Sequence, residues 1–185
     1  MARGYSQSRS ELTAQDYDDM DAKRQFRDNP PTPREKARAE ANQRAEVVAQ
    51  HLKTAYTIAE KVHEKQTRRD GKPYITHVLE VADGTRSWKA RMVALLHDTM
   101  EDGNVSRELL ESSKVPEDVI AAVEALTRPP KSEQKMTYQE YIEQVVKTNE
   151  LARQVKIADL KSNLKDNDNP GQVKRYERAL KALLP

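Results

Sequence analysis

The residue types best suited to chemistry lie in one short segment, Leu95-Leu96-His97-Asp98-Thr99-Met100-Glu101-Asp102. One histidine and three carboxylates follow an apolar run typical of a buried helix, where packing alone gives no reason for such a cluster. At about 100° per residue, a helix would hold these four polar side chains within an arc of roughly 140°. We therefore expect one cleft to be lined by His97, Asp98, Glu101 and Asp102.

Two further segments supply partners for this cluster. Pro73-Tyr74-Ile75-Thr76-His77 ends in a second histidine, and the apolar segment 155–160 contains one carboxylate, Asp159. Two imidazoles with two carboxylates suit a divalent transition metal such as Mn²⁺, Fe²⁺ or Zn²⁺, because Mg²⁺ and Ca²⁺ sites generally use oxygen ligands. Buried charges are costly unless they are paired or bind a metal. The sequence therefore predicts a metal site with the ligands His77, His97, Asp98 and Asp159.

Composition excludes several classes of protein. With 32 Lys and Arg against 30 Asp and Glu, the net charge of +2 predicts no general binding to nucleic acid or membranes. The absence of cysteine excludes disulfides, thiolate zinc sites and cysteine nucleophiles. No apolar run is long enough for a membrane span, and the N-terminus is polar, so we expect a soluble, cytoplasmic protein. Neither a Rossmann nor a P-loop nucleotide motif occurs.

The elements that must position these residues are helices. Residues 1–31 contain few aliphatic side chains and are expected to form a mobile tail, with a short partner-binding helix over residues 11–27 as the alternative. The ordered domain is expected over residues 32–185, beginning where Thr32 and Glu35 can form a capping box. Apolar spacing predicts an all-α fold with helices over residues 32–66, 75–81, 86–100, 107–112, 116–127, 137–147, 149–164 and 173–184.

Three ordered motifs resemble those of HD-domain phosphohydrolases, and among these the alarmone hydrolases of the RelA/SpoT and small alarmone hydrolase type. The motifs are Arg68-Arg69-Asp70-Gly71-Lys72-Pro73-Tyr74-Ile75-Thr76-His77, then residues 95–102, then Val155-Lys156-Ile157-Ala158-Asp159-Leu160-Lys161-Ser162-Asn163-Leu164, so the resemblance covers roughly residues 45–165. It implies an HD-domain helical bundle that releases pyrophosphate from the 3′ position of guanosine tetra- or pentaphosphate. It also implies that the predicted ligands hold Mn²⁺ and that the attacking water is oriented or deprotonated by Glu101 and Asp102.

Cationic and amide side chains near these motifs suit a phosphorylated nucleotide. A pyrophosphate leaving group needs positive charge, which the loop before the first metal histidine can supply. The alternative for the loop cations is a solvated charge run, and for the amide a helix cap. We expect substrate binding by Arg68, Arg69, Lys72, Lys156 and Asn163.

Two departures from the family pattern keep other functions open. Val78 stands where the family usually has proline, and Leu126-Thr127-Arg128-Pro129-Pro130-Lys131 replaces an acidic stretch that many alarmone hydrolases carry. This basic stretch is either a lid over a polyphosphate or a surface loop. The alternatives are an HD phosphatase acting on an adenosine alarmone, a deoxynucleotide or NADPH, and a non-catalytic, antitoxin-like protein that binds a partner, for example through the tail. No synthetase segment follows the motifs, so we expect a stand-alone hydrolase.

Overall fold

The computed structural model describes residues 30–103 and 105–184, together with Thr13, Gln15, Asp18 and Met20. The chain divides into two compact units, Met1–Ala45 and Glu46–Pro185. Most of the predicted tail, including the alternative helix over residues 11–27, lies outside the described residues. The described ranges contain helices and no strands, which confirms the predicted all-α class. Within them, no helix combines the length and apolar character that crossing a bilayer requires.

The first long helix, α2, spans Pro33–His63 and begins as the sequence predicts. Glu35 accepts a hydrogen bond from the Thr32 backbone N–H at 2.8 Å, and the Thr32 hydroxyl accepts one from the Glu35 N–H at 3.3 Å. These two bonds form the expected capping box. The helix ends three residues before the predicted position 66, and its C-terminal part buries Ala55, Ala59 and His63.

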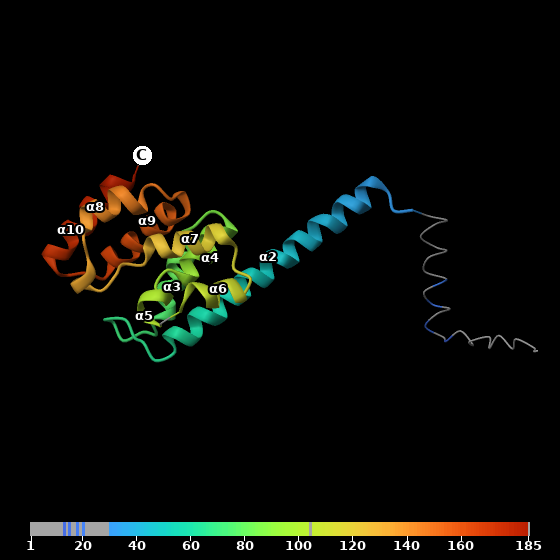
Figure 1. The fold of residues 1–185 in the computed structure, drawn as a ribbon, viewed down its shortest axis with the longest axis horizontal. Helices are drawn as coiled ribbons and strands as arrows, with labels where there is room; N and C mark the ends of the chain where they lie inside the picture. The colour runs from blue at the N-terminus through green and yellow to red at the C-terminus, as the bar shows by residue number, and fades with distance from the viewer. Residues whose placement is uncertain are drawn as a thin grey trace, which may run out of the picture. The chain divides into compact units, whose positions relative to one another are not determined.

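The remaining helices pack around α4, which spans Trp88–Leu96. It contacts α3 (Ile75–Asp83), α7 (Glu117–Leu126) and α9 (Glu150–Lys165), and these elements lie side by side in Figure 1. Large apolar side chains of α4 and α9, including Met92, Leu96 and Leu160, are buried between them. The other elements are α5 (Thr99–Asp102), α6 (Arg107–Ser112), a 3₁₀ turn (Lys131–Glu133), α8 (Tyr138–Tyr141), a π-helix (Ile142–Val146) and α10 (Pro170–Leu183).

Side-chain caps explain where several helices begin. Asn149 accepts a hydrogen bond from the Ala152 N–H at 3.1 Å, as expected for the start of α9. Asn169 accepts one from the Gln172 N–H at 3.0 Å, so α10 begins at Pro170, three residues before the predicted start. The predicted helix over residues 137–147 has its capping box at Thr137, but its second half is a π-helix.

The prediction of one continuous helix over residues 86–100 is wrong. The helix stops at Leu96, and α5 begins at Thr99. The His97 ring N–H at Nδ1 donates to the Ala94 carbonyl at 2.7 Å, and the Thr99 hydroxyl donates to the Leu96 carbonyl at 2.7 Å. These side chains compete with backbone N–H groups for the carbonyls that would continue the helix. The interruption places His97 and Asp98 on a turn, so the predicted single helical arc does not describe them.

Candidate metal centre and adjoining cavities

Three side chains from separate elements converge in the interior. His77 comes from α3, His97 from the turn after α4, and Asp159 from α9, and all three are buried. One ligand atom from each lies within 4.8 Å of the others. The Asp159 Oδ1 atom is 3.3 Å from His77 Nε2 and 3.9 Å from His97 Nε2. Three of the four predicted metal ligands therefore form one group.

The fourth predicted ligand, Asp98, borders this group. Its Oδ2 atom is 3.0 Å from His97 Nε2 and accepts a hydrogen bond from the Tyr74 hydroxyl at 2.6 Å. Burial, with the negative charge of Asp98, raises the pKa of Tyr74, so the phenol stays protonated and acts as the donor. Asp98 is therefore oriented by Tyr74 beside the buried group.

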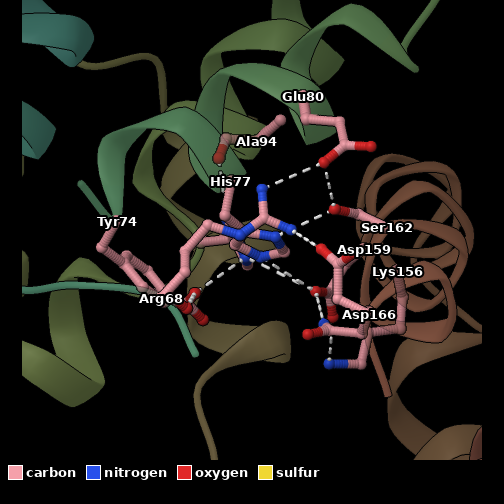
Figure 2. A network of polar contacts seen from close by, with 12 residues as sticks. Arg68, Tyr74, His77, Glu80, Ala94, Lys156, Asp159, Ser162 and Asp166 are labelled. Carbon is pink, nitrogen blue, oxygen red and sulfur yellow. Dashed lines mark hydrogen bonds and ion pairs between the residues drawn. The ribbon is translucent and has the colours of Figure 1, made fainter. Parts of the chain in front are cut away.

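The outer ring nitrogens of both histidines are occupied, which directs the inner ones toward each other. His97 Nδ1 donates to the Ala94 carbonyl, an acceptor only, so the neutral ring has its lone pair on Nε2. The Ser162 hydroxyl donates to Glu80 at 2.8 Å and lies 3.0 Å from His77 Nδ1, from which it can accept (Figure 2). Such outer partners typically fix the tautomer and orientation of metal-binding histidines.

The electrostatics of the group favour a bound cation. Burial opposes protonation of His97, but Asp98 and Asp159 outweigh it and raise its pKa to about 9. Burial likewise opposes ionisation of Asp98, yet His97 holds its pKa at about 2. His97 Nε2 is buried, and its charged neighbours are the carboxylates of Asp98, at 3.0 Å, and Asp159, at 3.9 Å. A divalent metal would meet the same demand for positive charge, so this set of imidazole and carboxylate donors fits such an ion.

Two predicted substrate contacts also support Asp159. Lys156 Nζ is 2.8 Å from Asp159 Oδ2, and the Asn163 amide donates to Oδ1 (Figure 2 draws the lysine pair). Burial opposes ionisation of Asp159, but Lys156 and the two histidines lower its pKa. Both residues also line a cavity beside the group. Lys156 and Asn163 are thus in place to hold the carboxylate and to face a bound molecule.

The three loop cations predicted to bind substrate already have protein partners. Arg68 forms ion pairs with Glu80 at 3.2 Å and Asp166 at 2.6 Å (Figure 2). Arg69 donates to amide oxygens of α10 and the preceding loop, at 3.0 Å and 3.1 Å. Lys72 pairs with Asp70 at 2.8 Å across the turn. Among the residues that the structure describes, Arg69 has no carboxylate partner, whereas the charges of Arg68 and Lys72 are paired with carboxylates.

Two cavities adjoin the metal candidate. The smaller, of about 190 Å³, is lined by Arg68, Arg69 and His77. The larger, of about 270 Å³, contains His97, Asp98 and Asp159 in its wall. Tyr74 and Asn163 line both, so the two cavities flank the buried group. A molecule bound at the group therefore has room on two sides.

The two predicted catalytic carboxylates have different surroundings. Glu101 lines the larger cavity and accepts a hydrogen bond from the Arg128 backbone N–H. Asp102 lines neither cavity and interacts with Gln66 and His63. Partial burial raises the pKa of each carboxyl group, and the negative charge of Asp98 raises it further. These two effects outweigh the contacts that lower the pKa, such as the Arg128 N–H for Glu101. Of these two carboxylates, only Glu101 therefore lines the larger cavity.

Several residues around the site were not expected from the sequence. Ser162 lies inside the third motif, but neither its residue type nor its position in the sequence indicated that it contacts a histidine. The basic stretch did single out Arg128, without indicating which cavity it lines. The larger cavity is also lined by Tyr138, Arg175 and Tyr176. These residues lie outside all three motifs, so the sequence did not indicate that they border the site.

Comparison with known proteins agrees with this geometry. The HD-domain family profile matches residues 74–164. The bifunctional (p)ppGpp synthase/hydrolase SpoT of Escherichia coli K12 is 46% identical over 55 residues, which cover 28% of this chain and 8% of that protein. The guanosine-3′,5′-bis(diphosphate) 3′-pyrophosphohydrolase of Aquifex aeolicus is 34% identical over 102 residues, covering 51% and 14%. The chain thus matches only a small part of these relatives' length.

A solved structure shares both the fold and part of the sequence. It belongs to a metazoan SpoT ortholog described as hydrolysing ppGpp, with a TM-score of 0.59 and 26% identity over 72% of this chain and 83% of that one. The matched profile spans His77, His97, Asp98 and Asp159. The chain therefore carries an HD domain, similar to those of the SpoT-type ppGpp hydrolases.

Proposed function

We propose that the protein is a metal-dependent guanosine-3′,5′-bis(diphosphate) 3′-pyrophosphohydrolase, which releases pyrophosphate from (p)ppGpp. The observation that carries this proposal is the buried group of His77, His97 and Asp159, in which both histidines have outer hydrogen-bond partners. The names of the relatives in Escherichia coli and Aquifex aeolicus, and of the metazoan structure, support the choice of substrate.

The proposed metal ligands are His77, His97, Asp98 and Asp159, and the proposed ion is Mn²⁺ or another divalent transition metal. Mixed imidazole and carboxylate donors support this class of ion. When bound, such an ion supplies Lewis-acid catalysis and lowers the pKa of a coordinated water molecule. The chain's own residues orient the donors: Ser162 and Ala94 hold the two imidazoles, and Tyr74 holds Asp98.

Glu101 is the proposed proton acceptor. It lines the larger cavity with Asp98 and Asp159, and its raised pKa brings it closer to neutral pH, where a general base works best. The Arg128 N–H holds one carboxylate oxygen and leaves the other to accept a proton. We assign Asp102, which lies toward Gln66, a supporting part in orienting water.

The smaller cavity is the proposed place of the leaving pyrophosphate. Arg69 contributes a guanidinium that pairs with no carboxylate among the described residues, and Arg68 lines the same wall. Lys156 and Asn163 line the larger cavity from α9 and are proposed to contact the nucleotide. Lys72, which pairs with Asp70 in the same loop as Arg69, is proposed as a further contact that would have to exchange this partner for a phosphate. Charge-assisted contacts of this kind stabilise a polyphosphate more than neutral hydrogen bonds do.

We also propose a cytoplasmic enzyme with a catalytic domain over residues 32–185 and a tail over residues 1–31 that catalysis does not need. The nucleotide substrate and the lack of cysteine support this location. A protein partner for the tail remains a secondary proposal, because its composition suits partner binding more than a packed core.

One observation favours a second candidate, an HD phosphatase acting on another nucleotide. Arg128 stands in a basic stretch where many alarmone hydrolases are acidic, and it lines the larger cavity. A panel of substrates with Mn²⁺ present distinguishes the two candidates. Equal amounts of GDP and pyrophosphate from guanosine tetraphosphate support the proposal, with His97→Ala as the inactive control. Intact guanosine tetraphosphate, alongside dephosphorylation of a deoxynucleotide, an adenosine alarmone or NADPH, would establish the alternative.

A further inference from the structure

Among the described residues, two arginines that line the larger cavity have no carboxylate ion-pair partner. Arg128 follows α7, and Arg175 lies on α10, more than forty positions later in the chain. Among the described residues, no carboxylate lies within ion-pairing distance of either one, whereas Arg68, Arg107 and Arg153 are all paired. Two uncompensated guanidinium groups near one another repel, unless an anion lies between or beside them.

A single aromatic ring holds these two guanidinium groups. The Cζ atom of Arg128 lies 5.2 Å from the centroid of the Tyr138 ring, and that of Arg175 lies 5.0 Å from it. Each arginine also approaches a second ring, Tyr141 at 5.3 Å and Tyr176 at 5.5 Å respectively. Stacking holds a guanidinium by its face and leaves its N–H edge available for a planar or tetrahedral anion.

Arg128 is further fixed in place by its own loop. One of its terminal nitrogens donates to the Gln134 side-chain oxygen at 2.7 Å, and the Gln134 amide donates back to the Pro129 carbonyl at 2.8 Å. The side chain therefore loses little conformational entropy when it binds a ligand, because its rotamer is already restricted. Such preorganisation is expected of a recognition residue and not of a solvated cation.

The cavity that these arginines line also contains His97, Asp98 and Asp159. A substrate whose scissile phosphate lies at the metal ligands therefore extends toward Arg128 and Arg175. We propose that Arg128 and Arg175, supported on Tyr138, form a subsite for a second, non-scissile phosphate group of the nucleotide. This inference deepens the proposed function and depends on it for the identity of the substrate.

A phosphate fits this subsite better than a nucleobase does. The Tyr138 ring already has two guanidinium groups over it, so it supports cations and does not serve as a free stacking surface. Phosphate oxygens accept bidentate hydrogen bonds from arginine and compensate its charge. For guanosine tetraphosphate, the group in question is the 5′-diphosphate, since the 3′-diphosphate is the one cleaved.

The kinetic test compares two substrates that differ only in the second phosphate group: guanosine tetraphosphate, and guanosine 3′-diphosphate with a free 5′-hydroxyl. Arg128→Ala and Arg175→Ala should each raise KM for guanosine tetraphosphate about ten- to a hundredfold, as expected for a lost charge-assisted contact. KM for the 5′-hydroxyl substrate should change less than about threefold. Equal effects on both substrates, or none on either, would overturn the subsite.

Matched control variants test whether the effect depends on the positions of the two arginines and on the Tyr138 ring beside them. Lys131→Ala removes an exposed cation from the same loop, and Lys174→Ala removes one beside Arg175 on α10, yet neither lysine lines the cavity. Both should leave KM for guanosine tetraphosphate within about twofold. Tyr138→Phe keeps the ring and should retain most of the affinity, whereas Tyr138→Ala should reproduce the arginine variants. Thermal unfolding of every variant shows whether the domain still folds.

A binding measurement keeps this inference separable from the proposed function. GDP carries the 5′-diphosphate without a scissile group, so calorimetric titration of the full-length, Mn²⁺-loaded protein reports binding alone. Arg128→Ala and Arg175→Ala should weaken GDP binding about tenfold or more, while guanosine binding stays unchanged. If the wild type releases no pyrophosphate from guanosine tetraphosphate, the proposed function fails while this test still applies. Unchanged GDP affinity in both variants refutes the subsite, whatever the activity.

Discussion

Replacing Ser162 by alanine tests whether the hydrogen bond at the outer nitrogen of His77 orients this proposed metal ligand. Ser162 is buried, with 2% of its surface exposed, and its hydroxyl links His77 Nδ1 at 3.0 Å to Glu80 at 2.8 Å. Alanine removes one oxygen atom and leaves the imidazole N–H without its acceptor in the interior. A buried unsatisfied donor costs about 1–3 kcal/mol. The ring can then rotate, or it can change tautomer so that Nε2 carries the proton; in either case the Nε2 lone pair is no longer directed toward the other ligands.

The expected loss of metal affinity follows from the same interaction. Outer partners of metal-binding histidines typically contribute a factor of about 10 to 100 in affinity, or about 1.4 to 2.7 kcal/mol. This range agrees with the cost of the unsatisfied donor, so one broken contact accounts for it. We expect Ser162→Ala to bind Mn²⁺ about 10 to 100 times more weakly, as measured by calorimetric titration.

The matched control for this prediction is Lys165→Ala. Lys165 pairs with the same Glu80 carboxylate but is exposed and does not touch the serine. Its removal should change Mn²⁺ affinity less than about threefold, because exposed ion pairs contribute little. If Ser162→Ala binds Mn²⁺ as tightly as the wild type, the relay from Glu80 through Ser162 to His77 has no role in metal binding.

Three further predictions follow from the site and the fold. Glu101→Gln should retain metal and lose at least about 10² in kcat, and Asp102→Asn should lose less, because only Glu101 lines the larger cavity; equal losses would contradict this distinction. Deleting residues 1–31 should leave kcat/KM within about threefold, and a large loss would show that the tail completes the site. Hydrogen bonds from Lys165, Ser162 and Arg68 together lower the pKa of Glu80 to about 2 from its usual 4.5, so the stability that these contacts contribute is present above about pH 4.5 and is lost as pH falls toward 2. Urea unfolding in that window should show a smaller pH dependence in Glu80→Gln, and an unchanged dependence would assign it to other carboxylates.

Patterns of apolar spacing and capping predicted much of the fold. The helix over residues 107–112 has the predicted bounds, and the Thr32 and Thr137 capping boxes form as expected. These features depend on neighbours within one or two turns, so a single sequence contains the information. The break after Leu96 was missed because it depends on side chains of His97 and Thr99 bonding to carbonyls, which apolar periodicity does not register.

In the candidate site, too, the residues of the motifs were predictable from the sequence and their partners from distant parts of the chain were not. Residue types and motif order brought His77, His97, Asp98 and Asp159 together in the prediction, and the structure places them side by side. The long-range partners were not predictable in this way. Arg68 was expected to face substrate, but its ion pair with Asp166 joins residues 98 positions apart. Likewise, the Arg175 guanidinium meets Tyr138 only through the packing of α10 on the neighbouring π-helix.

The most direct test of the account measures metal occupancy and pyrophosphate release in the same samples. Metal-depleted protein is titrated with Mn²⁺, bound metal is determined by elemental analysis, and pyrophosphate released from guanosine tetraphosphate is quantified at each point. If the protein is a metal-dependent hydrolase, the rate rises in proportion to occupancy, reaches a plateau at about one ion per chain, and is lost with the bound metal in His97→Ala and Asp159→Ala. Pyrophosphate release at full rate from metal-depleted protein, or unchanged metal content in both variants, would contradict it.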